Sequence, residues 1–298
     1  MSLALCLAPV VLASCSTGSP RVPGGADAPL RVVAAENFWG SIAAQLGGAH
    51  VLVASIIDSP DADPHDYEPT TADGRAVASA DLVLVNGVGY DTWATKLVDA
   101  NPDPSRAVVD VGRLVGVAAG GNPHRWYDPA DVQQVVDRLT DEYQRLDPSH
   151  AAYYAERRVA FDTTATRAYK TVLAEIRARY AGTPVGASES IFAMIVPALG
   201  LDLVTPQGFL TAISQGTDPT AADKAAIDQQ IKERRIKVYV YNAQNATPDI
   251  QSQIAEARSA GIPVTTITET MTPANATWEQ WQTAQLVALR DALAMAVP

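Results

Sequence analysis

Residues 147–182 read DPSHAAYYAERRVAFDTTATRAYKTVLAEIRARYAG, from Asp147 to Gly182. After Pro148 this segment contains no proline or glycine until Gly182, and its large apolar side chains recur at helical spacing throughout. A continuous helix of about 33 residues would be roughly 50 Å long, which is more than an ordinary domain helix needs. Its polar face lacks the regular charge pattern of a coiled coil. We therefore predict a single linking helix over residues 147–182, joining two folded lobes.

On both sides of this helix, short β-branched segments alternate with amphipathic segments. In the first half, strands are predicted at 31–35, 51–57, 81–86 and 107–111, and helices at 38–46, 71–78, 92–99 and from Pro129 onward, with Asp128 as the cap. In the second half, strands are predicted at 184–188, 203–205, 237–241 and 263–267, and helices at 191–199, 220–233, 247–260 and 276–296. Such alternation is typical of parallel sheets covered by helices on both faces. The predicted fold class is α/β, with two such lobes and a ligand site in the cleft between them.

The length and charge of the chain set further limits. At 298 residues it exceeds the ~250 residues at which single cores tend to stop growing, which also favours two lobes. The net charge is −11 without a basic block, which argues against nucleic acid as a partner, because phosphate binding needs clustered lysine and arginine. The predicted organisation is a signal peptide at 1–14, a flexible lipid-anchored tether at 15–30, an N-terminal lobe at 31–146, the linking helix at 147–182 and a C-terminal lobe at 183–298.

The first residues resemble the leader of a bacterial lipoprotein. Residues 2–13 form an apolar run that is too short to span a bilayer and is typical of a signal peptide; a buried N-terminal helix is the alternative. The run leads into the sequence LASC, which resembles a lipobox and would make Cys15 the lipid-carrying first residue of the mature protein. Because the first two residues carry no positive charge, the true start is expected upstream. The only cysteines are Cys6 and Cys15, so the lobes can hold a metal only through nitrogen and oxygen ligands.

Two of the four histidines follow a proline inside a short polar loop. His65 lies in DADPHDYEPT (61–70) and His124 in NPHRWYDP (122–129). Proline fixes its own φ and biases its predecessor toward an extended form, so each loop holds its imidazole in a narrow orientation. Both loops follow predicted strands, where ligands bind on parallel sheets. Two unrelated surface histidines are the alternative, but neutral imidazole is the commonest ligand for transition metals, and the pair favours a metal site.

Two carboxylates stand at equivalent places in the second half. Glu189 follows the strand at 184–188, and Glu269 follows the strand at 263–267. The alternative is a role at a helix start, with Ser188 as the cap and Glu189 in the first turn, and with Thr268 or Thr270 as the cap near Glu269. Together with His65 and His124 they give four candidate ligands, two from each lobe, facing one cleft. Two imidazoles and two carboxylates suit Zn²⁺ or Mn²⁺ and do not suit Cu(I), which prefers sulfur.

The remaining polar residues fall into two groups. Glu68, Asn242 and Asn245 are predicted to hydrogen-bond the ligands and fix the imidazole tautomers. His50 ends a turn before a strand, and His150 lies in the first turn of the linking helix. We interpret these two histidines as surface residues.

With these motifs in place, the chain resembles the substrate-binding lipoproteins of the zinc/manganese ABC importers, whose two lobes are joined by one rigid helix. The resemblance covers about residues 31–296 and is carried by the two histidine loops, Glu189, YNAQ (241–244), GIPV (261–264) and Glu269. It implies that His65, His124 and Glu189 are the first three metal ligands, with Glu269 as the fourth. It also implies an extracytoplasmic monomer anchored to the cell membrane by lipid, partnered by an ABC permease and its ATPase, that catalyses no reaction.

The sequence leaves the metal and two rival functions open. Zinc-binding members of that family often carry a histidine-rich loop, but residues 66–123 contain no histidine, and Glu189 stands where those members often have a third histidine. Many members place Asp where this chain has Glu269. A metal-dependent surface adhesin is one alternative function. A metallohydrolase is another, although the chain has no His-Glu-x-x-His helix and no Gly-x-Ser-x-Gly turn.

Overall fold

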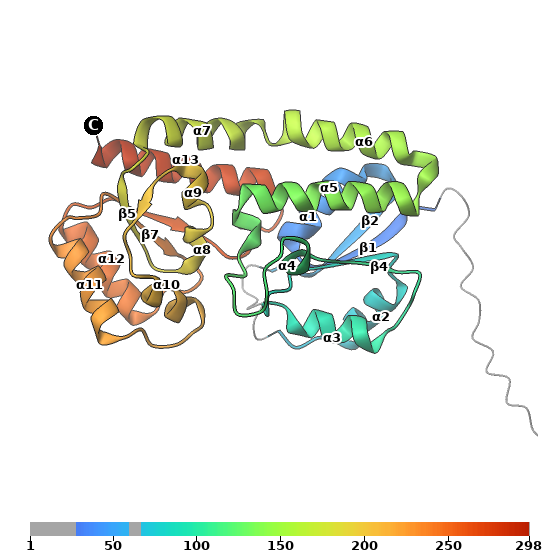
Figure 1. Ribbon diagram of the computed structural model, residues 1–298, viewed down its shortest axis with the longest axis horizontal. Coiled ribbons are helices and arrows are strands. Elements are labelled where there is room, and N and C mark those ends of the chain that lie inside the picture. The colour runs from blue at the N-terminus through green and yellow to red at the C-terminus, as the bar shows by residue number, and fades with distance from the viewer. Residues whose placement is uncertain (1–27, 60–66, 298) are drawn as a thin grey trace, which may run out of the picture.

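The computed structural model describes residues 28–59 and 67–297, in which two α/β lobes lie side by side beneath a long helical segment (Figure 1). The elements of the N-terminal lobe are β1 (Leu30–Glu36), α1 (Asn37–Gly47), η1 (Gly48–His50), β2 (Val51–Ile57), α2 (Thr71–Ser79), β3 (Leu82–Val85), α3 (Thr92–Ala100), β4 (Ala107–Asp110), α4 (Val111–Leu114), η2 (Arg125–Tyr127) and α5 (Pro129–Leu146). Their four strands form a parallel sheet in the order β2-β1-β3-β4. Helices α1 and α5 cover the face toward the helical segment, and α2 and α3 cover the other face.

The C-terminal lobe repeats this design. Its elements are β5 (Pro184–Ala187), α8 (Ser190–Ala193), α9 (Val196–Leu199), β6 (Asp202–Leu203), α10 (Gln207–Ser214), α11 (Ala221–Lys232), β7 (Tyr239–Asn242), α12 (Pro248–Ser259), β8 (Val264–Ile267) and α13 (Trp278–Ala296). The strands are again parallel, in the order β6-β5-β7-β8. Two parallel sheets flanked by helices confirm the predicted α/β fold class.

Local sequence signals explain several element boundaries. Asp128 caps α5 by accepting a hydrogen bond from the Ala130 N–H (2.8 Å), and Pro129 occupies the first helical position, as predicted. The predicted helix at 191–199 is two short helices, α8 and α9, and Pro197 lies in the first turn of α9. Proline is tolerated at a helix start and not inside one, so a break before it is expected. The short helix α4 and the helix α10 were not predicted.

The linking segment is helical along its length but is not one regular α-helix. It consists of η3 (Pro148–His150), α6 (Ala151–Ala160), a π-helical turn η4 (Phe161–Ala165) and α7 (Arg167–Tyr180). The hydroxyl of Thr166 donates to the carbonyl oxygens of Phe161 and Asp162, both at 3.0 Å. A threonine hydroxyl that bonds the preceding turn perturbs a helix, and apolar periodicity alone does not reveal such a single wide turn. The predicted linking helix is therefore present, but it departs from α geometry at η3 and again at η4.

One hydrophobic core runs through both lobes. The same cluster of buried side chains contains Phe38 of α1, Tyr169 of α7 and Leu286 of α13. Helix α13 packs along α7 and reaches α1 in the other lobe, where the Trp278 N–H donates to the Ser41 hydroxyl (2.9 Å). The lobes therefore share a core across their interface, and smaller clusters lie under the outer face of each sheet. Within residues 28–59 and 67–297, no helix is both long and apolar enough to cross a membrane.

Candidate metal centre

His124 is the best-defined candidate ligand. Its side chain is 1% exposed, in the loop that joins α4 to α5. The side-chain oxygen of Asn122 lies 2.7 Å from His124 Nδ1 and also accepts the His124 backbone N–H (3.1 Å). Because Asn122 Nδ2 donates to the Ser190 carbonyl (2.7 Å), its Oδ1 is the atom that faces the ring, so Nδ1 carries the proton. The lone pair is then on Nε2, the atom that would bind a metal.

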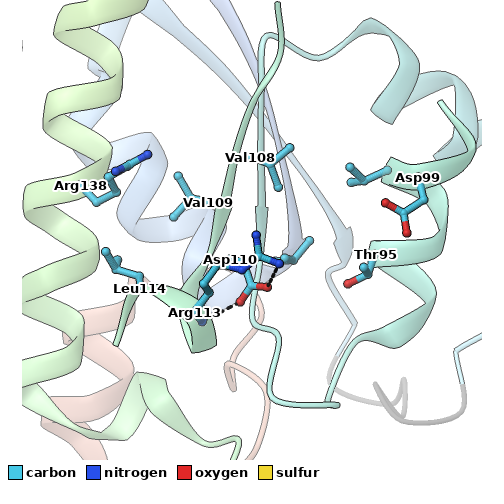
Figure 2. A pocket seen from close by; sticks show the side chains of 10 residues that line it. Thr95, Asp99, Val108, Val109, Asp110, Arg113, Leu114 and Arg138 are labelled. Atoms are coloured by element: carbon cyan, nitrogen blue, oxygen red, sulfur yellow. Dashed lines mark hydrogen bonds and ion pairs between the residues drawn. The ribbon is translucent and has the colours of Figure 1, made fainter. Parts of the chain in front are cut away.

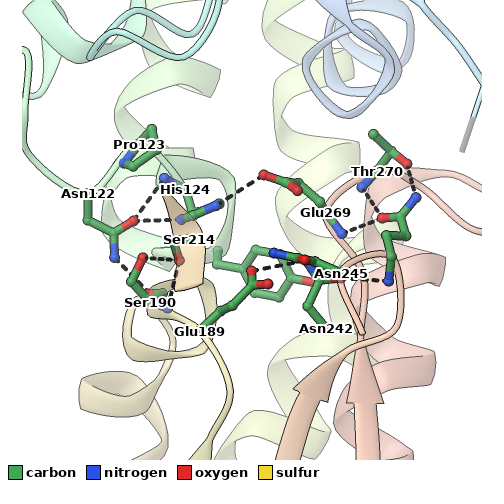
Figure 3. Close-up of polar contacts among 12 residues, drawn as sticks. Asn122, Pro123, His124, Glu189, Ser190, Ser214, Asn242, Asn245, Glu269 and Thr270 are labelled. Atoms are coloured by element: carbon green, nitrogen blue, oxygen red, sulfur yellow. Dashed lines mark hydrogen bonds and ion pairs between the residues drawn. The ribbon is translucent and has the colours of Figure 1, made fainter. Parts of the chain in front are cut away.

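Glu269 from the opposite lobe meets this nitrogen. Its Oε1 lies 3.2 Å from His124 Nε2, and its side chain is 16% exposed (Figure 3). The loop after β8 is fixed to the loop after β7, because Gln244 Oε1 accepts the backbone N–H groups of Glu269 (2.6 Å) and Thr270 (2.9 Å). Glu269 does not stand at a helix start, because the next helix, α13, begins only at Trp278. Glu189 does, because α8 begins directly after it.

Glu189 is buried, with 2% of its surface exposed, at the position that precedes α8. Its side chain makes no capping hydrogen bond to that helix, so capping does not account for this carboxylate. Instead Glu189 Oε2 accepts a hydrogen bond from Asn242 Nδ2 (3.0 Å). Ser188, the alternative cap, accepts the Asn242 backbone N–H (3.0 Å). The end of β5 is thereby fixed to the end of β7, and the carboxylate is held near the cleft (Figure 3).

Three of the four candidate ligands are thus placed on loops at the carboxyl ends of strands or just beyond them, from both lobes. His65 lies outside the described residues, so its predicted role stays a prediction. Glu68 is described and is solvent-exposed. Asn242 hydrogen-bonds the carboxylate of Glu189 and not the predicted imidazole, and the Asn245 side-chain amide donates to the Ile213 carbonyl (3.4 Å).

Sequence reasoning missed Asn122, which both orients His124 and bonds to the C-terminal lobe. The signal was available, since an asparagine two residues before the histidine can accept the latter's backbone N–H in an Asx-turn. It also missed the hydrogen bonds that close the lobe interface nearby. The Tyr127 hydroxyl donates to the Thr268 carbonyl (2.7 Å), and Trp278 Nε1 donates to the Trp126 carbonyl (3.2 Å).

A buried pair of acids lies behind the His124 loop. Asp91 accepts the backbone N–H groups of Asn86 (2.6 Å) and Gly87 (2.8 Å), yet burial raises its pKa to about 6. Burial, followed by the nearby charge of Asp91, raises the pKa of Glu36 well above its usual range. Asn86 connects this pair to the loop, because its Nδ2 donates to the Pro123 carbonyl (2.9 Å). Nothing in the local sequence identified these two acids as neighbours.

Two cavities help to locate the accessible surface. One of about 440 Å³ lies between the lobes and is lined by residues of both, among them Tyr90, Pro123 and Ser190. Another, of about 420 Å³, lies in the N-terminal lobe beside β4, where Asp110 accepts the Arg113 backbone N–H (2.9 Å; Figure 2). Among the residues that the structure describes, the lining of the second cavity includes no histidine and no residue of the candidate metal centre.

Residues 32–292 match the family model described as zinc-uptake complex component A, periplasmic. The chain belongs to this family. Among curated relatives of this zinc-uptake component family, the manganese-binding lipoprotein MntA of Halalkalibacterium halodurans is 29% identical over 137 residues, which is 44% of this chain and 45% of that protein. The iron-binding protein YfeA of Yersinia pestis is 32% identical over 130 residues, which is 42% of each chain. The chain spans about half the length of the curated relatives it matches.

Solved structures share the fold. The manganese-bound periplasmic metal-binding protein of Candidatus Liberibacter asiaticus has a TM-score of 0.72 at 18% identity, covering 89% of this chain and 99% of that chain. Zinc-bound AdcA of Streptococcus pneumoniae has a TM-score of 0.67 at 18% identity, covering 89% of this chain and 58% of that chain. At this level of identity, the likeness shows the two-lobed fold alone.

Proposed function

We propose that this protein is the metal-binding component of an ABC importer, which captures Zn²⁺ or Mn²⁺ outside the membrane and delivers the ion to a permease driven by an ATPase. The observation that carries the proposal is the pairing of His124 Nε2 with Glu269 Oε1 across the lobe interface, at 3.2 Å. The imidazole is buried and its tautomer is fixed by Asn122, which is how proteins commonly prepare a histidine for a metal.

The proposed ligands are His65, His124, Glu189 and Glu269, with Asn122 and Asn242 as their hydrogen-bonding supports. Two nitrogens and up to four carboxylate oxygens suit zinc and manganese. The names of the curated relatives, which include manganese-binding and iron-binding proteins, support a divalent transition metal as the cargo. At most nitrogen and oxygen sites raw affinity favours zinc over manganese, so availability in the cell decides between them.

Metal binding would stabilise the closed pairing of the lobes, because each lobe supplies half of the ligands. The shared core and the hydrogen bonds at Asn122, Tyr127 and Trp278 favour a small rearrangement over a wide opening of the lobes. Release would then be completed when the protein docks on the permease. We place the protein outside the cytoplasm, held to the membrane through Cys15, and assign it no catalytic reaction. Affinity should fall at acid pH, because both imidazoles must be unprotonated to bind.

The test is the metal content of the full-length protein after stripping and re-equilibration with mixed zinc and manganese salts. Cys6→Ser and Cys15→Ser are included throughout, so that thiolates do not bind zinc. His65→Ala and His124→Ala should each lose one equivalent of metal relative to the unsubstituted protein. Equal metal content in all three proteins would reject the site and the carrier function with it.

A further inference from the structure

The other two histidines, interpreted from the sequence as separate surface residues, lie against each other. His50 ends η1 and His150 ends η3, and their rings stack with centroids 3.7 Å apart and planes 21° from parallel. The rings of His50 and Tyr153 also form a T-shaped contact, with 4.7 Å between their centroids. Both histidines are partly exposed, as surface residues are, but their contact with each other was not predicted. Local sequence carries no sign of this contact, because the two residues are a hundred positions apart.

A carboxylate completes the group. Asp147 Oδ2 lies 2.8 Å from His150 Nδ1, and the Asp147 side chain is 17% exposed. The carboxylate is held in place by the hydroxyls of Tyr154, which donates to Oδ2 (2.8 Å), and Ser149, which donates to Oδ1 (2.7 Å). Although burial opposes it, these hydrogen bonds and the adjacent imidazole hold the pKa of Asp147 below its usual value. The group therefore combines two imidazoles with an ionised carboxylate.

We propose that His50, Asp147 and His150 form a second binding site, for a divalent transition-metal ion such as Zn²⁺. One ligand atom from each residue lies within 4.8 Å of the other two. Ligand atoms of a tetrahedral zinc site are about 3.4 Å apart, given Zn–N and Zn–O bonds of ~2.1 Å. Because an imidazole lone pair lies in the plane of its ring, the two stacked rings would have to turn toward each other to bind one ion. The ion takes the place of the shared proton between His150 Nδ1 and Asp147 Oδ2. The fourth position is left to water, since the His150 side chain is 27% exposed.

The position of this site gives the ion a structural effect. His50 lies in the turn between α1 and β2, and Asp147 and His150 lie at the start of the linking segment. A bound ion would cross-link the N-terminal lobe to that segment at its first turn. An unfolded chain does not hold three ligands from such distant positions together, so the ion binds the folded state preferentially and raises its stability. This site shares no residue with the proposed cargo site and does not depend on the proposed function.

The experiment titrates ZnCl₂ into the metal-stripped full-length protein carrying Cys6→Ser and Cys15→Ser, by calorimetry and by thermal unfolding. His124→Ala is added to disable the first site. We expect one equivalent of zinc to bind this variant and to raise its unfolding temperature. His50→Phe, which keeps a ring in the stack but removes its nitrogens, should abolish that equivalent. Asp147→Asn, which keeps an acceptor for Tyr154, should lower the zinc affinity of this site by at least about tenfold.

The outcomes separate the two sites. If the His124→Ala protein binds no zinc, or binds it equally well with His50→Phe or Asp147→Asn added, the second site is rejected. Loss of an equivalent between the unsubstituted protein and His124→Ala reports on the cargo site alone. The metal-free unfolding temperature of each variant shows whether it is folded, and the shift caused by zinc is read relative to that value.

Discussion

Replacing Asn242 by alanine tests whether Glu189 is a metal ligand. Asn242 is fully buried, and its Nδ2 donates to Glu189 Oε2 (3.0 Å), while its Oδ1 accepts the Gln244 backbone N–H (3.0 Å). The substitution therefore removes a donor that orients the carboxylate and an acceptor that fixes the loop after β7. Gln244 in turn holds the backbone of Glu269, so the change disturbs two proposed ligands.

The expected magnitude follows from these two hydrogen bonds. Loss of a partner that orients a metal ligand typically lowers affinity about 10- to 100-fold, which corresponds to about 1.4–2.8 kcal/mol of binding free energy. This range agrees with the ~1.5–3 kcal/mol contributed by a hydrogen bond to a charged group. The unpaired Gln244 N–H should also lower the free energy of unfolding of the metal-free protein by about 1–3 kcal/mol.

The assay is zinc affinity measured by competition with a chelator, in the Cys6→Ser, Cys15→Ser background with His50→Phe to remove the second site. Asn245→Ala is the matched control, because that amide donates to the main chain of Ile213 at 3.4 Å. We expect the control to retain affinity within about threefold, since a long hydrogen bond contributes little. Glu189 is not a ligand held by Asn242 if Asn242→Ala binds zinc as tightly as its parent, or if both asparagine variants lose the same affinity.

Three further predictions concern residues around the centre. Asn122→Ala should lower metal affinity about 10- to 100-fold, because His124 loses the acceptor that fixes its tautomer; unchanged affinity in the same competition assay would contradict this. The pKa of Asp91 is about 6 in the folded protein, which is above its unfolded value. The protonated carboxyl group therefore stabilises the folded state below about pH 4, and this stabilisation is lost as the pH rises to about 6. Urea unfolding should therefore show the parent losing stability relative to Asp91→Asn over that interval and a constant difference above it; a difference that grows in the opposite direction would be contrary evidence. Trp126→Ala should lower the free energy of unfolding, measured in urea, by about 3–5 kcal/mol, because this buried ring stacks on Phe38 with 3.9 Å between ring centroids. A decrease of less than about 1 kcal/mol would show that the stack is dispensable.

The sequence predicted what depends on neighbouring residues. Asp128 and Pro129 indicated the start of α5, and β-branched runs indicated the strands, because capping and periodicity are local properties. The rule for parallel sheets placed Glu189 and Glu269 directly after strands and His124 in a loop beyond β4, whereas His65 lies outside the described residues. For His124, Glu189 and Glu269, the described structure bears out this placement, while their role as ligands remains a prediction.

What the sequence did not predict depends on which elements become neighbours. Glu36 and Asp91 are close because β1 lies between β2 and β3 in the sheet. The sequence of a single strand does not reveal which strands become its neighbours. The contact between Asn122 and Ser190 and the stacking of His50 on His150 likewise join distant segments. Periodicity also cannot distinguish one hydrophobic core from two, since each helix shows only that it has an apolar face.

The π turn at Phe161–Ala165 has a geometric consequence for how the lobes are joined. Each residue of an α-helix advances the side chain by about 100° around the axis, so one extra residue in a wide turn rotates everything that follows by about that angle. Helix α6 packs on α1 and α5, whereas the buried stripe of α7, which includes Tyr169 and Ile176, packs on α13. The turn therefore sets the angle, around the helix axis, between the face of α6 that packs on α1 and α5 and the face of α7 that packs on α13. Deleting a single residue there would leave both helices intact but turn one of them away from its partner.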